Sequence, residues 1–155
     1  MLRLIYEQHE AVAQFVVRLI PHNGGHGFGK AKTIGVIDED GRLVGGVIYG
    51  NYDPVAETIE MAGAAITPRW LTRRIIEAIY QYPFLQCGCQ MIYQRTPADD
   101  ERLLRQLAAG GYSFIKIPRM FGRNRDGVLC MLTYEDWTNS KFIRRSAVPA
   151  IEEAA

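Results

Sequence analysis

The chain has 155 residues, in which 18 lysines and arginines stand against 17 aspartates and glutamates. This length fits one domain that buries most of the apolar surface exposed by its unfolded form. The near-zero net charge offers no overall field for a polyanion, which argues against nucleic-acid binding. No apolar run reaches the roughly 18 residues of a membrane span, so no membrane partner is expected.

The chain has three cysteines, a small and odd number that does not suit a secreted disulfide framework. We therefore interpret Cys87, Cys89 and Cys130 as reduced thiols and expect a cytoplasmic protein. No second pair of Cys or His residues stands at a zinc-like spacing from Cys87 and Cys89, so no metal site is predicted.

The first elements are a short strand at residues 2–7 and an amphipathic helix at 9–20, which Pro21 ends. The glycine-rich segment that follows matches a phosphate-binding P-loop at 24–31 except in its last position, Ala31. A P-loop follows a strand and opens a helix, whereas this segment follows a helix and enters a strand. Nucleotide hydrolysis is therefore not predicted, nor is a metal site at its histidines.

Residues 33–38 and 42–49 are β-branched and apolar runs joined through an Asp-Gly turn, which predicts a hairpin. Residues 58–67 predict a third strand, antiparallel to this hairpin. Small residues at 62–65 in that strand indicate a place where another backbone or a ligand comes close.

The second half predicts a helix that follows a basic turn and runs to Tyr82 before Pro83, and then a strand at 90–94. Thr96, followed by a proline and an acidic residue, is typical of a helix start. The helix it opens would end at Gly110-Gly111. The closing strands are expected at 114–118 and 128–134.

This order of elements resembles the GNAT (N-acetyltransferase) superfamily over roughly residues 2–137. The hairpin, the Arg-Trp-Leu-Thr-Arg turn at 69–73 and the Leu-Thr-Tyr-Glu-Asp-Trp run at 132–137 are most similar to phage- and prophage-encoded members. The resemblance implies an α/β (α+β) fold, with a mixed, mostly antiparallel sheet of about six to seven strands flanked by helices and a splayed strand pair. It also implies a single domain at 1–137 and a C-terminal tail at 138–155.

The function that this resemblance implies is an acyl-CoA-dependent N-acyltransferase, with acetyl-CoA as cofactor, that transfers the acyl group directly to an unidentified amine. The cofactor would lie along the third strand and at the start of the helix that follows, where free amides, hydroxyls and basic side chains suit a pyrophosphate. The residues expected to bind it are Ala64, Ile66, Thr67, Arg69, Thr72, Arg73, Arg74 and Asp100. The chain departs from the family because residues 69–74 contain neither glycine of the usual pyrophosphate loop.

Direct transfer needs a base for the ammonium and an acid for the leaving thiolate. Glu60 on the third strand is the predicted base, and Glu57 is the second choice. Family members often carry the acid where this chain has Leu107, so Tyr93 or Tyr112 is expected to substitute. Each of these residues has a structural alternative, since Glu60 could be an outward strand residue and a buried tyrosine usually just finds a hydrogen bond.

Two other functions stay open. A degenerate GNAT-fold protein of phage origin could serve as a binding or structural component without catalysis. Basic and aromatic residues at 119–125 and 142–145 could contact single-stranded nucleic acid, although a solvated loop and tail explain them more simply. The acceptor would be chosen by loops at 21–32 and 120–127, and a homodimer is left open.

Overall fold

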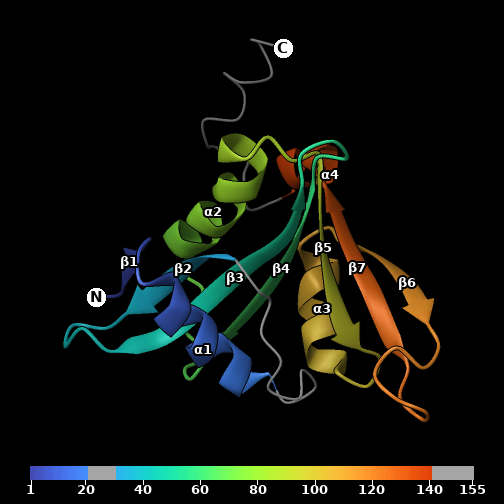
Figure 1. Cartoon of the computed structure of the whole chain (residues 1–155), viewed down its shortest axis with the longest axis horizontal. Coiled ribbons are helices and arrows are strands. Elements are labelled where there is room, and N and C mark those ends of the chain that lie inside the picture. The colour runs from blue at the N-terminus through green and yellow to red at the C-terminus, as the bar shows by residue number, and fades with distance from the viewer. Residues whose placement is uncertain (21–30, 141–155) are drawn as a thin grey trace. The chain divides into compact units, whose positions relative to one another are not determined.

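The computed structural model describes residues 1–20 and 31–140 (Figure 1). The glycine-rich segment with its P-loop-like motif and the tail beyond Ser140 therefore lie outside the described residues. The chain divides into two compact units, Met1–Gln94 and Arg95–Ala155. Among the described residues, no helix is long and apolar enough to cross a membrane.

Within the described residues, seven strands form one sheet in the order β1-β2-β3-β4-β5-β7-β6. The β4–β5 pair is parallel, and the pairs β1–β2, β2–β3, β3–β4 and β6–β7 are antiparallel. The predicted fold class, a mixed and mostly antiparallel sheet flanked by helices, is thus confirmed. The strands are β1 (Arg3–Ile5), β2 (Lys32–Ile37), β3 (Leu43–Asp53), β4 (Thr58–Ala65), β5 (Met91–Pro97), β6 (Ser113–Ile117) and β7 (Gly127–Thr133). The helices are α1 (His9–Leu19), α2 (Arg73–Gln81), the π-helical η2 (Tyr82–Gln86), α3 (Glu101–Ala109) and α4 (Tyr134–Thr138).

In the first unit, α1 packs on one face of strands β2, β3 and β4 (Figure 1). Val12 and Val16 of this helix are fully buried and form a cluster with Ile48 of β3. Because side chains alternate along a strand, Gly46 lies on the same face as Ile48. A Cβ atom at Gly46 would lie 2.8 Å from Val12 Cγ1, so the missing side chain lets α1 approach the sheet closely.

Helix α2 is anchored to β3 through Tyr49, which alternates to the face opposite Gly46 and Ile48. The buried Tyr49 hydroxyl donates a hydrogen bond of 2.5 Å to the carbonyl of Ile79. That carbonyl would normally accept from the amide four residues later, but this position is Pro83, which has no N–H. Tyr49 therefore supplies the missing donor, and burial raises its pKa well above the ordinary value.

The chain does not leave the helical path at Pro83 as predicted. It continues as the π-helix η2, in which the amide of Cys87 donates to the carbonyl of Tyr82 at 3.0 Å. Pro83 occupies the first turn of η2. Cys87, Cys89 and Cys130 are free thiols, in agreement with the prediction, and burial raises the pKa of Cys89 to about 11.

Two predicted boundaries in the second half are wrong. Thr96 does not cap a helix, because β5 extends through it and buries it. Helix α3 begins at Glu101 instead, and the Asp100 carboxylate caps it by accepting from the amide of Leu103 at 3.3 Å. The last strand ends at Thr133, whose hydroxyl accepts from the amide of Asp136 and so starts α4.

In the second unit, β6 and β7 form an antiparallel hairpin that pairs Ser113 with Met131. The predicted stop of α3 at Gly110 and Gly111 is confirmed, because Gly111 has φ 99°, which favours glycine. The amide of Tyr112 then donates to the carbonyl of Leu107 at 3.1 Å and turns the chain toward β6.

Replacing Tyr49 by phenylalanine removes the donor to the Ile79 carbonyl while keeping the ring. We expect Tyr49→Phe to lower the free energy of unfolding by about 0.5–1.5 kcal/mol, because the buried hydrogen bond to the Ile79 carbonyl is lost. Urea denaturation of the two proteins measures this difference. Tyr52→Phe is the matched control, because the half-exposed Tyr52 hydroxyl also donates to a carbonyl, that of Cys87 at 3.2 Å. An equal loss in both variants would contradict the special role of Tyr49.

Candidate functional site

Strand β4 pairs with β5 over only part of its length. The described ladder between them holds three pairs, from Thr58↔Met91 to Glu60↔Tyr93. Beyond Glu60, β4 continues to Ala65 and is paired to β3 on its other side. The last five residues of β4 therefore have a ladder partner on one side only, as in the splayed strand pair that was predicted.

Glu60 lies at the last pair of this ladder, and only 3% of its surface is exposed. Its carboxylate oxygen Oε1 accepts a hydrogen bond of 2.7 Å from Nδ2 of Asn51. This burial contradicts the alternative that Glu60 is an outward, solvated strand residue. Tyr93 is its register partner on β5, so the two side chains extend from the same face of adjacent strands. The structure thus brings together a buried carboxylate, an amide and a phenol.

The other two acid and base candidates are not part of this pair of strands. Glu57 precedes β4 in an exposed, left-handed conformation with φ 59°, and its backbone carbonyl accepts from the amide of Gln90 at 2.8 Å. Tyr112 belongs to the second unit, where 7% of its surface is exposed. Neither residue shares the register of Glu60 and Tyr93.

Other parts of the protein pack against the small residues of β4. Ala62 and Ala64 pack against the α1 cluster, on the same face as Glu60. On the other face, a Cβ at Gly63 would lie 3.5 Å from Cη2 of the Trp70 indole. The small residues thus allow α1 and Trp70 to come close to the strand, and binding of a ligand arm to the backbone of β4 stays a prediction. The open edge of β4 is what a ligand can reach.

Trp70 is seated on two neighbouring strands. A Cβ at Gly45 of β3 would lie 2.6 Å from Cε3 of the indole and 3.1 Å from the Ala65 side chain. The indole thus rests where Gly45 has no side chain. Trp70 lies within the turn from β4 to α2, so this contact fixes where α2 begins.

The first turn of α2 is capped by Thr72, whose Oγ1 accepts from the amide of Ile75 at 3.3 Å. A helix leaves its first amides without carbonyl partners, and the amides of Arg73 and Arg74 have none among the described residues. These amides and the positive end of the helix dipole suit an anion. The Thr72 hydroxyl keeps its own proton for donation while it caps.

The three arginines of the basic turn do not converge. Arg73 forms an ion pair of 3.6 Å with Glu77 on the next turn of α2. Arg74 lines a separate groove of about 500 Å³ together with Arg3 and Tyr6 of the N-terminal segment. Arg69 is exposed and forms no ion pair with any described residue. Arg69 is therefore available to a ligand, and it does not line the groove that holds Arg74.

The remaining predicted cofactor residues have mixed positions. Ile66 is 63% exposed and Leu71 is 42% exposed. Two apolar side chains therefore face solvent beside the basic turn. Thr67 is used within the turn, where its Oγ1 accepts from the amide of Arg69 at 3.4 Å. Asp100 caps α3 in the second unit.

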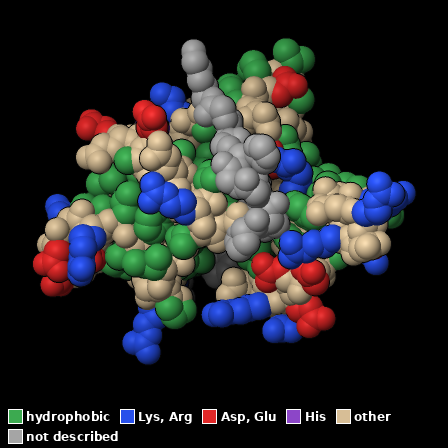
Figure 2. Space-filling model, turned by 60° about the horizontal axis from the view of Figure 1, so that its bottom comes forward, with side chains coloured by type: hydrophobic (Ala, Val, Ile, Leu, Met, Phe, Trp, Pro, Cys, Tyr) green, Lys and Arg blue, Asp and Glu red, His purple; other side chains and the backbone are tan. Residues whose placement is uncertain are grey.

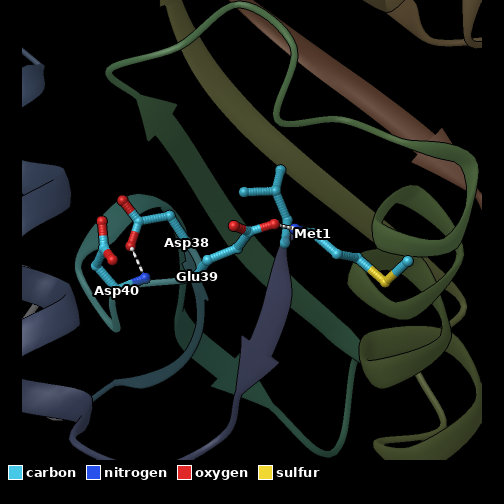
Figure 3. A pocket seen from close by; sticks show the side chains of 5 residues that line it. Met1, Asp38, Glu39 and Asp40 are labelled. Carbon is cyan, nitrogen blue, oxygen red and sulfur yellow. Dashed lines mark hydrogen bonds and ion pairs between the residues drawn. The ribbon is translucent and has the colours of Figure 1, made fainter.

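A second hollow, of about 340 Å³, lies at the tip of the β2–β3 hairpin and is lined by Met1, Leu2 and the acidic residues 38–40 (Figure 3). The Met1 amino group contacts Glu39 Oε1 at 2.5 Å, and this contact lowers the pKa of the Glu39 carboxyl. The hairpin tip lies at the opposite end of β3 from the residue that pairs with Glu60. This acidic hollow is therefore separate from the Glu60 site.

Basic and acidic side chains stand beside one another on the face drawn in Figure 2. Within the part of the chain that the structure describes, no three His, Cys, Asp or Glu side chains gather in a group that could hold a metal ion.

No protein-family model and no curated protein matches the sequence. Solved structures do match the fold. Mutant forms of the spermidine/spermine N-acetyltransferase SpeG from Vibrio cholerae match with a TM-score of 0.73 and 14% identity, over 90% of this chain and 98% of that one. The dodecameric spermidine N-acetyltransferase from Vibrio cholerae matches with a TM-score of 0.69 and 14% identity, over 89% of this chain and 96% of that one. A probable acetyltransferase matches with a TM-score of 0.60 and 16% identity, over 70% of this chain and 63% of that one. The chain therefore has the GNAT fold of these N-acetyltransferases.

Gly45 and Gly63 both lie beneath the Trp70 indole, but its position predicts that a side chain is tolerated less well at Gly45 than at Gly63. A Cβ at Gly45 would collide with the rigid indole, whereas one at Gly63 would meet its neighbours at ordinary contact distances of 3.4–3.5 Å. We expect Gly45→Ala to destabilise the fold by about 1–3 kcal/mol and Gly63→Ala to cost clearly less. Urea denaturation measures both, and equal costs would show that Trp70 is not held in this seat.

Proposed function

We propose that residues 1–137 form one domain that transfers an acyl group from an acyl-CoA, most simply acetyl-CoA, to an amine. The observation that carries this proposal is the buried carboxylate of Glu60 at the point where the β4–β5 ladder ends. From there the open edge of β4 leads over five residues, about 17 Å, toward the turn before α2. One strand thus links a candidate base to a candidate phosphate site, over a distance of the kind that a pantetheine arm spans.

The side chains near the α2 N-terminus fit coenzyme A in their chemistry. Helix amides without partners and the Arg69 guanidinium suit its pyrophosphate. The exposed side chains of Ile66 and Leu71 suit its apolar parts, since large aliphatic groups in solvent gain by being covered. Arg73 and Arg74 would contribute through their amides more than through their charges, because one is paired and the other lines a different groove.

The reaction would need two proton transfers by the protein. Bound acetyl-CoA would supply a thioester whose carbonyl carbon forms a bond to the amine nitrogen while its carbon–sulfur bond breaks. An amine is mostly protonated at neutral pH, so the Glu60 carboxylate would first take the ammonium proton, directly or through a water. The Tyr93 phenol, on the same face of the adjacent strand, would give a proton to the leaving thiolate. The second proton, which the nitrogen loses as the amide forms, would return to the Tyr93 phenolate through water.

The acceptor is an amine whose identity is open. The matching structures include spermidine and spermidine/spermine N-acetyltransferases, so spermidine and spermine are the first two amines to be tested as acceptors. Cytoplasmic location and phage or prophage origin stay predictions of the sequence. A homo-oligomer is proposed as the assembly, because a dodecamer occurs among the structures with this fold.

The second candidate is a protein that keeps the fold for binding alone. It is favoured by the turn at 67–72, where Pro68 has no N–H and the amides of Arg69 and Thr72 are already used within the turn. Fewer amides therefore remain for a phosphate than in a glycine-rich turn. Catalysis and cofactor binding must be tested separately to decide between the two candidates.

Catalysis is tested with Glu60→Gln, which keeps the size and hydrogen bonding of the side chain but cannot accept the proton. We expect turnover to fall about 100-fold or more while the binding of acetyl-CoA is unchanged. Release of free thiol with the amine panel measures turnover, and calorimetry measures binding. Glu57→Gln is the matched control and should keep the parent rate. If the two variants reverse this order, the base is Glu57.

Cofactor binding is tested with Arg69→Ala against Arg74→Ala. We expect Arg69→Ala to weaken acetyl-CoA binding about tenfold, because it removes an unpaired charge beside the helix amides, and Arg74→Ala to have a smaller effect. For the parent, acetyl-CoA at about 100 times its Kd should stabilise the fold by about 2.7 kcal/mol in a thermal-shift titration. No shift at millimolar acetyl-CoA would reject the enzyme and favour the binding protein.

A further inference from the structure

We propose that Asn51 is a positioning residue for Glu60, which holds the carboxylate in the orientation needed to accept a proton. The inference rests on the proposed acyltransferase function and adds to it a residue on a different strand. Its basis is the 2.7 Å hydrogen bond from Asn51 Nδ2 to Glu60 Oε1.

The hydrogen bond acts on a carboxylate that has little water around it. Glu60 is 3% exposed, and a buried carboxylate depends on protein donors in place of solvent. An amide that donates to one oxygen fixes the plane of the carboxylate and thereby the direction of its second oxygen. A base held in this way needs less reorganisation before it accepts a proton.

The backbone around Asn51 explains how an exposed residue reaches a buried one. Asn51 has φ 53°, in the left-handed region that asparagine tolerates better than most residues. The β3–β4 register shifts between Gly50 and Asp53, so the chain bulges at this position. A bulge redirects side chains, and here it directs the Asn51 amide over the neighbouring strand to Glu60.

The bulge is held independently of the hydrogen bond to Glu60. Asp53 pairs with Thr58 beyond the shift. Its Oδ1 accepts from the amides of Val55 and Ala56 at 2.9 and 3.0 Å, which closes the turn. The side chain of Asn51 can therefore be removed without opening this turn.

The experiment compares Asn51→Gly, which keeps the left-handed backbone and removes the amide, with Asn51→Ala, which also strains the backbone. We expect Asn51→Gly to lower kcat about tenfold with the KM for acetyl-CoA and the calorimetric Kd unchanged. In a Glu60→Gln background, Asn51→Gly should cause no further loss, because the residue it positions no longer acts. A merely structural role would instead lower the thermal midpoint and leave kcat of the folded protein unchanged.

A second readout does not depend on activity. The Asn51 side-chain amide resonances in a ¹⁵N spectrum should move in Glu60→Gln and stay in place in Glu57→Gln. Parent-like kcat in Asn51→Gly, with Glu60→Gln impaired, would overturn the positioning role and leave the acyltransferase proposal standing. Absence of acetyl-CoA-dependent turnover in the parent would overturn both.

Discussion

The missing side chain at Gly45 determines where α2 begins, because the Trp70 indole occupies the space that a Cβ atom would need. At its other end the helix is tied to β3 by the hydrogen bond from Tyr49 to the Ile79 carbonyl. Both contacts lie on the same face of β3, since Gly45 and Tyr49 are an even number of residues apart. The N-terminus of α2 is therefore fixed relative to β3 and to β4, which pairs with it.

This arrangement explains why the two faces of β4 have different roles. The face toward Trp70 is covered by the turn that leads into α2, and Ala62 and Ala64 on the opposite face are covered by α1. Glu60 lies on the α1 face but beyond these alanines, at the last pair with β5, where Asn51 reaches it from the bulge. A buried carboxylate persists here because a polar partner lies beside it.

Much of the fold could be predicted from the sequence, because the hairpin, the helix periods and the glycine stop of α3 are local signals. The errors arose where contacts between distant parts of the chain, and not the local sequence, determine where a helix or strand ends. Pro83 marks a helix end locally, but Tyr49, 34 residues earlier in the sequence, compensates for its missing N–H. Thr96 matches a helix cap, yet the sheet buries it in β5. Asn51 could not be recognised as part of the site, because the bulge that directs it to Glu60 depends on strand pairing.

The most direct test of this account is a crystal structure of the full chain with coenzyme A. The account predicts that the pyrophosphate contacts the amides of Arg73 and Arg74, that the pantetheine arm follows the open edge of β4, and that the thiol ends beside Glu60 and Tyr93. Coenzyme A bound away from β4, with Glu60 far from the thiol, would contradict the claim that this strand links the phosphate site to the base.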